Sequence, residues 1–293
     1  MNWALYALLH SLCRAFFVET NRVYKVDSWH LTFLQALCGF LLLLPCVPFM
    51  HWPADPRFYF AAVIVAMITA VGYMIQLGLA AQKTGRVSGM YMPLEALTAT
   101  IVWVLVMPAA LELHTHNLLL SAGVVLAFAL ATFGMARIRE SDVSWATFLI
   151  VAPVGVTYAL SGIATKIVMP EVMIITTVLT YSFVCFFTMT LVLGFVLLLK
   201  KKASTAMLEK RTLRAGLLTG VFSVVGSLSF VASVAMAPNP GYTSMMAMLL
   251  PVWLMLFHKA MRVEDRAQPM AASMLVAGAV ILIGVTAFFS SAQ

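Results

Sequence analysis

The stretch 172–199 reads VMIITTVLTYSFVCFFTMTLVLGFVLLL and contains no charged residue. A helix needs about 20 mostly apolar residues to cross a hydrocarbon core about 30 Å thick, so this stretch is long enough to span a membrane. Its residues do not alternate between polar and apolar, as the residues of a barrel strand would. Because every backbone polar group in lipid must be bonded internally, the stretch predicts a transmembrane helix.

The rest of the chain has the same character. Of 293 residues, 62% are hydrophobic and 10% are charged, whereas soluble proteins have about 45–50% and about 25%. Apolar blocks of similar length predict ten spans, with boundaries at 3–18, 29–50, 58–81, 88–107, 117–136, 145–165, 172–199, 213–236, 242–257 and 270–289. The composition therefore predicts an all-α integral membrane protein with ten transmembrane helices.

The order of the spans predicts two five-helix halves, residues 1–140 and 141–293, which form one membrane domain without a soluble domain. The phosphate-binding pattern Gly-x4-Gly-Lys-Ser/Thr is absent from the sequence, so we expect no nucleotide-hydrolysing module. The 11 acidic residues are scattered, which argues against a membrane-embedded enzyme. His114 and His116 are too few for a metal site, and no cofactor is predicted.

The basic residues predict an orientation. Of the 18 Lys and Arg residues, fifteen lie in loops that follow odd-numbered spans, two in even-numbered loops and one within a span. Cytoplasmic loops of inner-membrane proteins retain Lys and Arg, so both termini are predicted to lie outside. Anionic lipid headgroups are the expected counterpart of the net charge of +7, and no nucleic-acid partner is needed to explain it.

The two halves carry a weak internal repeat. A shift of 155 residues places YMPLEAL (91–97) over MAMLLPV (246–252), and GVVL (123–126) over GAVI (278–281). Because each half has an odd number of spans, the second half must be inverted relative to the first. Inverted repeats of this kind place a binding site near the membrane midplane, where the halves meet.

These features resemble the EamA-type members of the drug/metabolite transporter superfamily. Span four carries Leu94-Glu95-Ala96 and span nine carries Leu249-Leu250-Pro251, each a partial copy of the family's Leu-Glu-Pro-like signature. Leu111-Glu112 and Glu264-Asp265 are loose counterparts of the acidic ending of these spans. The resemblance implies ten helices around a central cavity and transport by alternating access. The family commonly has cytoplasmic termini, whereas the basic residues here predict the reverse, and we follow the charges.

Polar residues within the spans are the candidates for the cavity. Ser88, Tyr91, Glu95 and Thr98 follow one another by three, four and three residues, which places them on one helical face. Glu95 is the only carboxylate near the centre of a span, and a charge there is costly unless it is paired, solvated or neutralised. Further candidates are His10 and Arg14 on span one, Gln35, Gln76, Tyr158 and Ser161 on spans two, three and six, and Tyr181 on span seven.

Three roles stay open for Arg14 and Glu95: an internal ion pair, direct contact with substrate, and proton coupling through Glu95. Pro93, Pro153 and Pro251 lie within spans and are predicted to kink helices that take part in gating. The four cysteines lie in apolar spans and are expected to be reduced.

The sequence predicts a secondary transporter, and an exporter of small polar or zwitterionic metabolites is favoured. An acid and a base in the presumed cavity suit a zwitterion. Amino acids, and amino-acid-derived compounds that include metallophores, are the expected substrate class. Efflux of hydrophobic cations is the alternative within transport, and a non-transporting receptor or assembly subunit is the alternative outside it. Membrane lipids are expected partners, and assembly as a homodimer stays open.

Overall fold

The computed structural model describes residues 2–82, 89–142, 145–170, 173–200, 205–262 and 269–291. Within these residues the regular structure is entirely helical. The longer helices are α1 (Asn2–Tyr24), α2 (Ser28–Leu43), α3 (Pro56–Gln82), α5 (Met92–Val106), α7 (Leu118–Asp142), α8 (Trp145–Val168), α9 (Ile174–Leu199), α10 (Lys210–Met236), α12 (Leu250–Ala260) and α13 (Pro269–Ser291). Shorter elements are α6 (Pro108–His116), α11 (Pro240–Ala247) and the 3-10 helices η1 (Leu44–Phe49) and η2 (Thr205–Leu208).

Eight helical segments in the described part of the chain are long and apolar enough to cross a membrane. α1, which carries His10, Arg14 and Glu19, is not among them, and α5 is a shorter apolar helix. Large apolar side chains such as Phe60 and Leu198 are each 69% exposed on the outer faces of these helices. Surfaces of this kind suit lipid tails and not water. The chain is therefore an all-α, multi-pass membrane protein.

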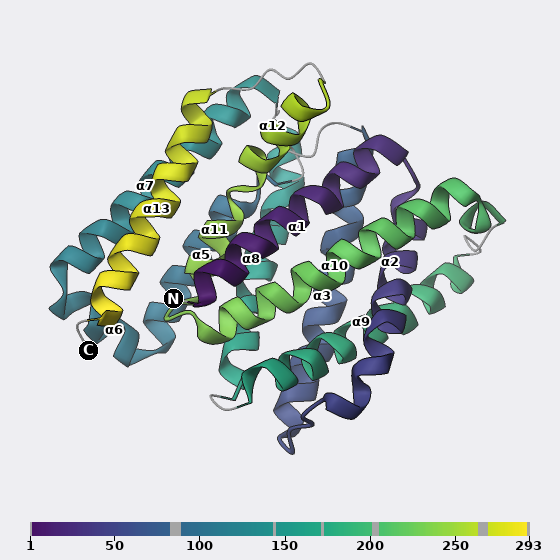
Figure 1. Cartoon of the computed structure of the whole chain (residues 1–293), viewed down its shortest axis with the longest axis horizontal. Coiled ribbons are helices and arrows are strands. Elements are labelled where there is room, and N and C mark those ends of the chain that lie inside the picture. The colour runs from purple at the N-terminus through teal and green to yellow at the C-terminus, as the bar shows by residue number, and fades with distance from the viewer. Residues whose placement is uncertain are drawn as a thin grey trace.

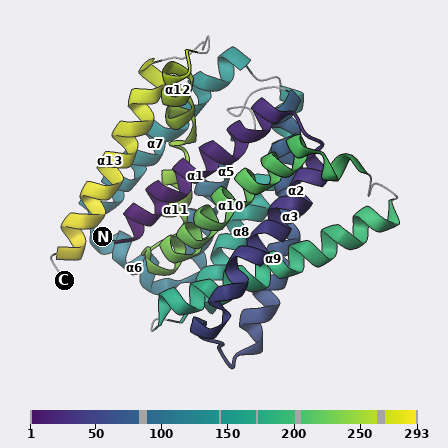
Figure 2. The same ribbon diagram turned by 45° about the vertical axis from the view of Figure 1, so that its right-hand side comes forward.

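The helices form one bundle in which distant segments pack together (Figure 1). α7 and α13 pack side by side at one edge, whereas α2 and α9 pack together at the other. α1 lies along α10 through the middle of the bundle, and the two termini lie near the same end of the molecule in both views (Figures 1 and 2). First-half and second-half helices are thus interleaved in space.

The end of the bundle opposite the termini carries polar contacts between helix ends. Glu19 of α1 accepts hydrogen bonds from Arg22, at 2.5 and 2.8 Å, and lies 3.3 Å from Nε2 of His258 on α12. Nζ of Lys200, just after α9, lies 4.4 Å from the ring centre of Trp29 at the start of α2. The C-terminal ends of α1, α9 and α12, which correspond to the first, seventh and ninth predicted spans, therefore lie on one side of the molecule.

The turn between α1 and α2 is fixed by side chains. Lys25 has φ 49°, the left-handed conformation in which many helices end. Asn21 accepts a hydrogen bond from Val26 N and donates to Leu77 O of α3, at 2.9 Å each. Asp27 caps α2 by accepting from Trp29 N and His30 N. The turn is therefore tied to α3 as well as to the helices that it joins.

Two predicted spans are not continuous helices, which corrects the role expected for two prolines. α5 begins at Met92, so Pro93 lies in its first turn. The ninth span is divided into α11 and α12, and Pro251 lies in the first turn of α12. Proline needs no backbone hydrogen-bond donor in a first turn. Both prolines therefore start helices, α5 after the turn at 89–91 and α12 after α11, and neither lies inside a continuous helix. Pro153 lies inside α8 as expected.

The region between the fourth and fifth spans also differs from expectation. The sequence predicts a loop there, whereas α6 occupies Pro108–His116. Pro108 at its start and the helix formers Ala109, Ala110 and Leu111 favour this short helix. His116 is exposed on it, and the described residues contain no group of three metal-ligating side chains.

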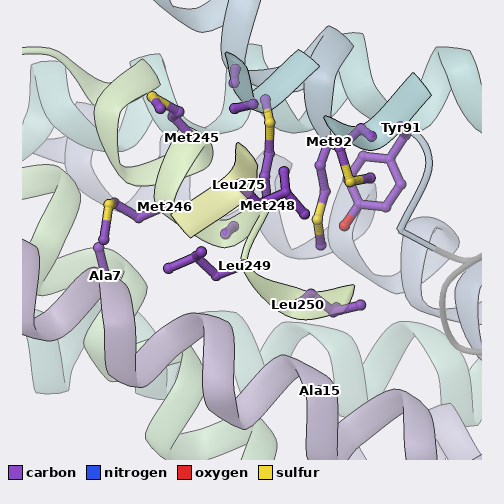
Figure 3. Packing of buried hydrophobic residues seen from close by; sticks show 14 of the residues in the cluster. Ala7, Ala15, Tyr91, Met92, Met245, Met246, Met248, Leu249, Leu250 and Leu275 are labelled. Carbon is purple, nitrogen blue, oxygen red and sulfur yellow. The ribbon is translucent and has the colours of Figure 1, made fainter. Parts of the chain in front are cut away.

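Methionines fill the space around the starts of α5 and α12. Figure 3 shows Met248, Leu249 and Leu250 beside Met92, with Met246 pointing towards Ala7 of α1, whereas Met245 lies further from α1. Met246 and Met92 are fully buried. The unbranched thioether adapts to irregular spaces such as those beside a helix break. Packing is thus the role of these methionines in this conformation.

Glycines allow close approach between α10 and α2. A Cβ at Gly216 would lie 2.7 Å from Cβ of Leu34, and a Cβ at Gly220 would lie 2.5 Å from Cβ of Cys38. Both distances are too short for a side chain, so this Gly-x3-Gly pair serves close helix contact.

Candidate functional site

A cavity of about 70 Å³ lies between α1, α3, α5, α8, α9 and α10, and it is large enough for several water molecules. Its polar lining residues, here called the polar wall, include His10, Arg14, Tyr73, Glu95, Tyr158, Ser161, Thr165 and Tyr181. Its apolar lining residues, here called the apolar wall, include Val65, Phe186, Met189, Phe230 and Val231. Both five-helix halves predicted from the sequence contribute residues to each wall.

Arg14 occupies the centre of the polar wall. Its NH2 group donates to Oε1 of Gln76 at 2.5 Å and to the hydroxyl of Tyr91. Its Cζ atom lies 5.6 Å from the ring centres of both Tyr91 and Tyr158, and these two rings meet at 83°. A guanidinium between two aromatic rings gains cation–π attraction in a site shielded from water. The position of Arg14 is therefore fixed by α3, α5 and α8 together.

Glu95 lies in the first turn of α5 and is 2% exposed. Its Oε1 accepts a hydrogen bond of 2.9 Å from the hydroxyl of Ser244 on α11. Gly155 of α8 allows α5 to approach closely here, because a Cβ on it would lie 2.7 Å from Tyr91 O and 3.3 Å from Glu95 N. The start of α5 also directs the helix dipole towards this carboxyl group, which favours a negative charge.

His10 lies one helical turn before Arg14 and is 5% exposed. Its Nδ1 lies 2.8 Å from Gly226 O on α10, and because a carbonyl only accepts, Nδ1 carries the proton of this bond. The ring packs on Phe230 with 5.0 Å between ring centres. His10 is therefore fixed on α10, and its Nε2 remains free to bond another group.

Three buried polar atoms around the cavity have no hydrogen-bond partner in the described part of the chain. They are Nε of Arg14, Oε2 of Glu95 and Nε2 of His10. A buried polar atom without a partner costs about 1–3 kcal/mol and more for a charged group, so such atoms are rare and call for an explanation. All three residues line the same cavity. This concentration is typical of a site that binds a polar molecule.

Arg14 and Glu95 do not form a direct ion pair. Both residues are described, and no salt bridge within 4.0 Å joins them. Each is instead hydrogen-bonded to a neutral side chain, Gln76 or Ser244. In this conformation the internal ion pair, one of the roles that the sequence leaves open, is absent.

Five of the other predicted site residues fall into two groups, those that line the cavity and those that hold Arg14. Tyr158, Ser161 and Tyr181 line the cavity, although Ser161 donates to Thr157 O and the hydroxyl of Tyr181 bonds Thr165 at 3.0 Å. Gln76 and Tyr91 lie behind the wall, where they hold Arg14.

Three predicted residues are not placed in the cavity. Nε2 of Gln35 donates to Oγ of Ser223 at 2.8 Å, which links α2 to α10 outside the cavity. Thr98 is partly buried on α5 and is not part of the cavity wall. Ser88 lies outside the described residues.

Sequence reasoning missed several residues of the site. Tyr73, three residues before Gln76 on α3, lines the cavity, and the spacing from Gln76 places both on one face. Ser244 had no local signal, because its partner Glu95 is 149 residues away. Phe186 and Phe230 form part of the apolar wall, and a buried Phe looks the same in sequence whether it faces a cavity or a neighbouring helix.

Comparison with known proteins shows the fold and no more. No family model matches the chain. No curated protein matches it. Among 24 matching chains of known structure, one described as "Crystal structure of protein" aligns with a TM-score of 0.60 and 12% identity, over 94% of this chain and 96% of its own length. The multi-pass helical architecture is therefore similar to that of a solved protein, and this likeness assigns no activity.

Proposed function

We propose that this chain is a secondary transporter that exports small zwitterionic metabolites, amino acids or compounds derived from them, by alternating access. The observation that carries the proposal is the cavity between apolar helices, where Arg14 and Glu95 are buried, unpaired with each other and each left with one free polar atom. Ionisable residues inside membrane spans are costly and mark substrate or ion pathways. A zwitterion supplies a carboxylate for Arg14 and an ammonium group for Glu95.

The helix contacts support the proposal of ten spans in two inverted repeats. Exchange of the halves pairs α1 with α8, α2 with α9, α3 with α10, α5 with α11 and α12, and α7 with α13. Under this exchange, the contact of α1 with α10 becomes that of α8 with α3, and the contact of α2 with α10 becomes that of α9 with α3. All four contacts are present. In the pairs α2–α9, α5–α11 and α7–α13, each helix also packs against its own counterpart from the other half.

The spans also add up to the proposed number. The structure has eight apolar segments long enough to span a membrane, and we propose that α1 and α5 are the other two of ten crossings. An even number agrees with two termini at one end of the bundle (Figure 1). We place the protein in an inner membrane with this end outside, on the distribution of basic residues alone.

A second candidate, export of hydrophobic cations, rests on the apolar wall and on Glu95. The guanidinium of Arg14 in the same cavity repels a cation and attracts an anionic group, which favours the zwitterion. Glu95 is also our candidate for coupling export to a proton gradient, because a carboxyl group can exchange a proton when the substrate leaves.

Flux through reconstituted vesicles tests the proposal. Vesicles containing the protein and loaded with radiolabelled neutral amino acids should release at least one of them faster than empty vesicles. Glu95→Gln keeps the shape of the side chain but removes its charge, and it should lower the flux by about tenfold or more. Glu209→Gln, an exposed change at the start of α10, serves as the control and should retain normal flux.

Two outcomes would contradict the proposal. Equal flux in Glu95→Gln and wild type would remove Glu95 from the substrate path. Release of ethidium with no release of any amino acid would favour export of hydrophobic cations instead.

A further inference from the structure

Two opposite charges in one water-poor cavity attract strongly, yet Arg14 and Glu95 remain apart. Free to move, the two side chains would close on each other and neutralise the site. Something in the surrounding structure must therefore hold at least one of them in place. The hydrogen bonds of Arg14 show which residue is best placed to do so.

Gln76 holds Arg14 from behind the cavity wall. Its Oε1 accepts from the NH2 group of Arg14 at 2.5 Å, and its Nε2 donates to the hydroxyl of Tyr158 at 2.9 Å. Gln76 is 1% exposed, so its amide is fixed on both sides. An amide is suited to this position because it both accepts and donates, whereas an ionised carboxylate only accepts and would neutralise Arg14 directly.

We propose that Gln76 is a positioning residue that keeps Arg14 from pairing with Glu95, so that both charges remain available to one zwitterionic substrate. On the other side, Ser244 holds Glu95 through Oε1 and leaves Oε2 without a partner. The rings of Tyr91 and Tyr158 limit sideways movement of the guanidinium. Neutral partners thus fix two opposite charges without neutralising them.

The consequence is selectivity for molecules that carry both charges. This inference rests on the proposed function, because it assigns how the proposed transporter distinguishes a zwitterion from an amine or an acid. A ligand with only one charge would leave either Arg14 or Glu95 without a counter-charge, and burial of an uncompensated charge is costly. The apolar wall formed by Val65, Phe186 and Phe230 suits the uncharged remainder of the molecule.

Leucine and two analogues provide the probes. Isocaproate lacks the amino group of leucine, and isoamylamine lacks the carboxylate. In detergent-solubilised protein, wild type should bind radiolabelled leucine, and unlabelled leucine should compete about 10- to 100-fold better than either analogue. Gln76→Leu should lose this preference, because Arg14 is then free to pair with Glu95.

Gln35→Leu is the matched control. It makes the same change at another buried glutamine, which donates one side-chain hydrogen bond to Ser223 and bonds neither Arg14 nor Glu95. Its melting temperature should fall, but leucine should remain the preferred ligand. Gln76→Glu adds a second variant of nearly native shape, in which a carboxylate neutralises Arg14, and its preference should shift from leucine to isoamylamine.

A double-mutant cycle of melting temperatures, here called the melting cycle, tests the pairing of Arg14 with Glu95 without any ligand. Glu95→Gln should lower the melting temperature less in wild type, where Arg14 and Glu95 do not touch. The same change should lower it by several degrees more in Gln76→Leu, where the two have paired.

Equal effects of Glu95→Gln in both backgrounds, or an unchanged preference for leucine in Gln76→Leu and Gln76→Glu, would overturn the inference about Gln76. Absence of leucine binding and flux in wild type would count against the proposed function, while the melting cycle would still decide the role of Gln76.

Discussion

Gly72 makes room for the hydroxyl end of Tyr158, and a single methyl group there should disturb the site. A Cβ built on Gly72 of α3 would lie 2.5 Å from Cζ and 2.7 Å from Cε1 of Tyr158, and closer still to its hydroxyl oxygen. Carbon atoms in contact prefer about 3.5–4.0 Å. In Gly72→Ala the ring must therefore move by about 1 Å, and its bond with Gln76 lengthens or breaks.

The expected cost follows from these contacts. Overpacking a filled interior costs about 1–3 kcal/mol, and loss of the bond between Gln76 and Tyr158 adds about 0.5–1.5 kcal/mol. Alanine favours a helix over glycine by about 1 kcal/mol, which offsets part of this cost. Gly72→Ala should therefore lower the free energy of unfolding by about 1–3 kcal/mol. Gly78→Ala is the control on the same helix, because its Cβ would meet only ordinary contacts with Ser28, at 3.6 Å and beyond.

Unfolding by dodecyl sulfate in mixed micelles measures both variants against wild type. Gly78→Ala should be as stable as wild type or slightly more stable. Tyr158→Phe removes the atom nearest the new methyl group, so Gly72→Ala should cost less in that background than in wild type. If Gly72→Ala is as stable as Gly78→Ala, or if Tyr158→Phe gives no relief, the ring of Tyr158 is not held where the structure places it.

Two further predictions concern the ends of the bundle. Glu19→Gln should lower the free energy of unfolding by about 2–3 kcal/mol, because it removes the buried negative charge that bonds Arg22 and contacts His258. Asp55→Asn, an exposed change, should cost about 1 kcal/mol or less, and equal melting of the two variants would contradict this. A reporter that is active only outside the cytoplasm should be active when fused after Gln293, and activity of a cytoplasmic reporter there would reverse the orientation predicted from the basic residues.

The all-helical membrane class could be predicted from the sequence because it depends on local composition. The residues of an apolar stretch such as 172–199 predict a transmembrane helix without any information about the rest of the chain. The same holds for Arg14 and Glu95, since an ionisable side chain within an apolar span is conspicuous without any structure. Both residues do line one cavity.

The partners of these residues could not be predicted in the same way. Gln76 and Ser244 act through contacts that span 62 and 149 positions of the chain, and no local periodicity encodes such a contact. The helix breaks are a similar case. Pro93 and Pro251 are conspicuous within apolar spans. The sequence does not show, however, whether such a proline lies inside a continuous helix or in the first turn of a new one, as both do here.

The broken ninth span joins the cavity to the end of the bundle that carries Glu19. Ser244 on α11 bonds Glu95, whereas His258 on α12 contacts Glu19 of α1. Between them, Met248 and Leu249 bond the carbonyls three residues earlier, Met245 O and Met246 O, in a tight turn. Because α1 also carries Arg14, a change of angle between α11 and α12 must either break the contact with Glu19 or move α1 and its guanidinium relative to Glu95. The alternating access that we propose needs such a link between the cavity and the helix end, and this break is our candidate for it.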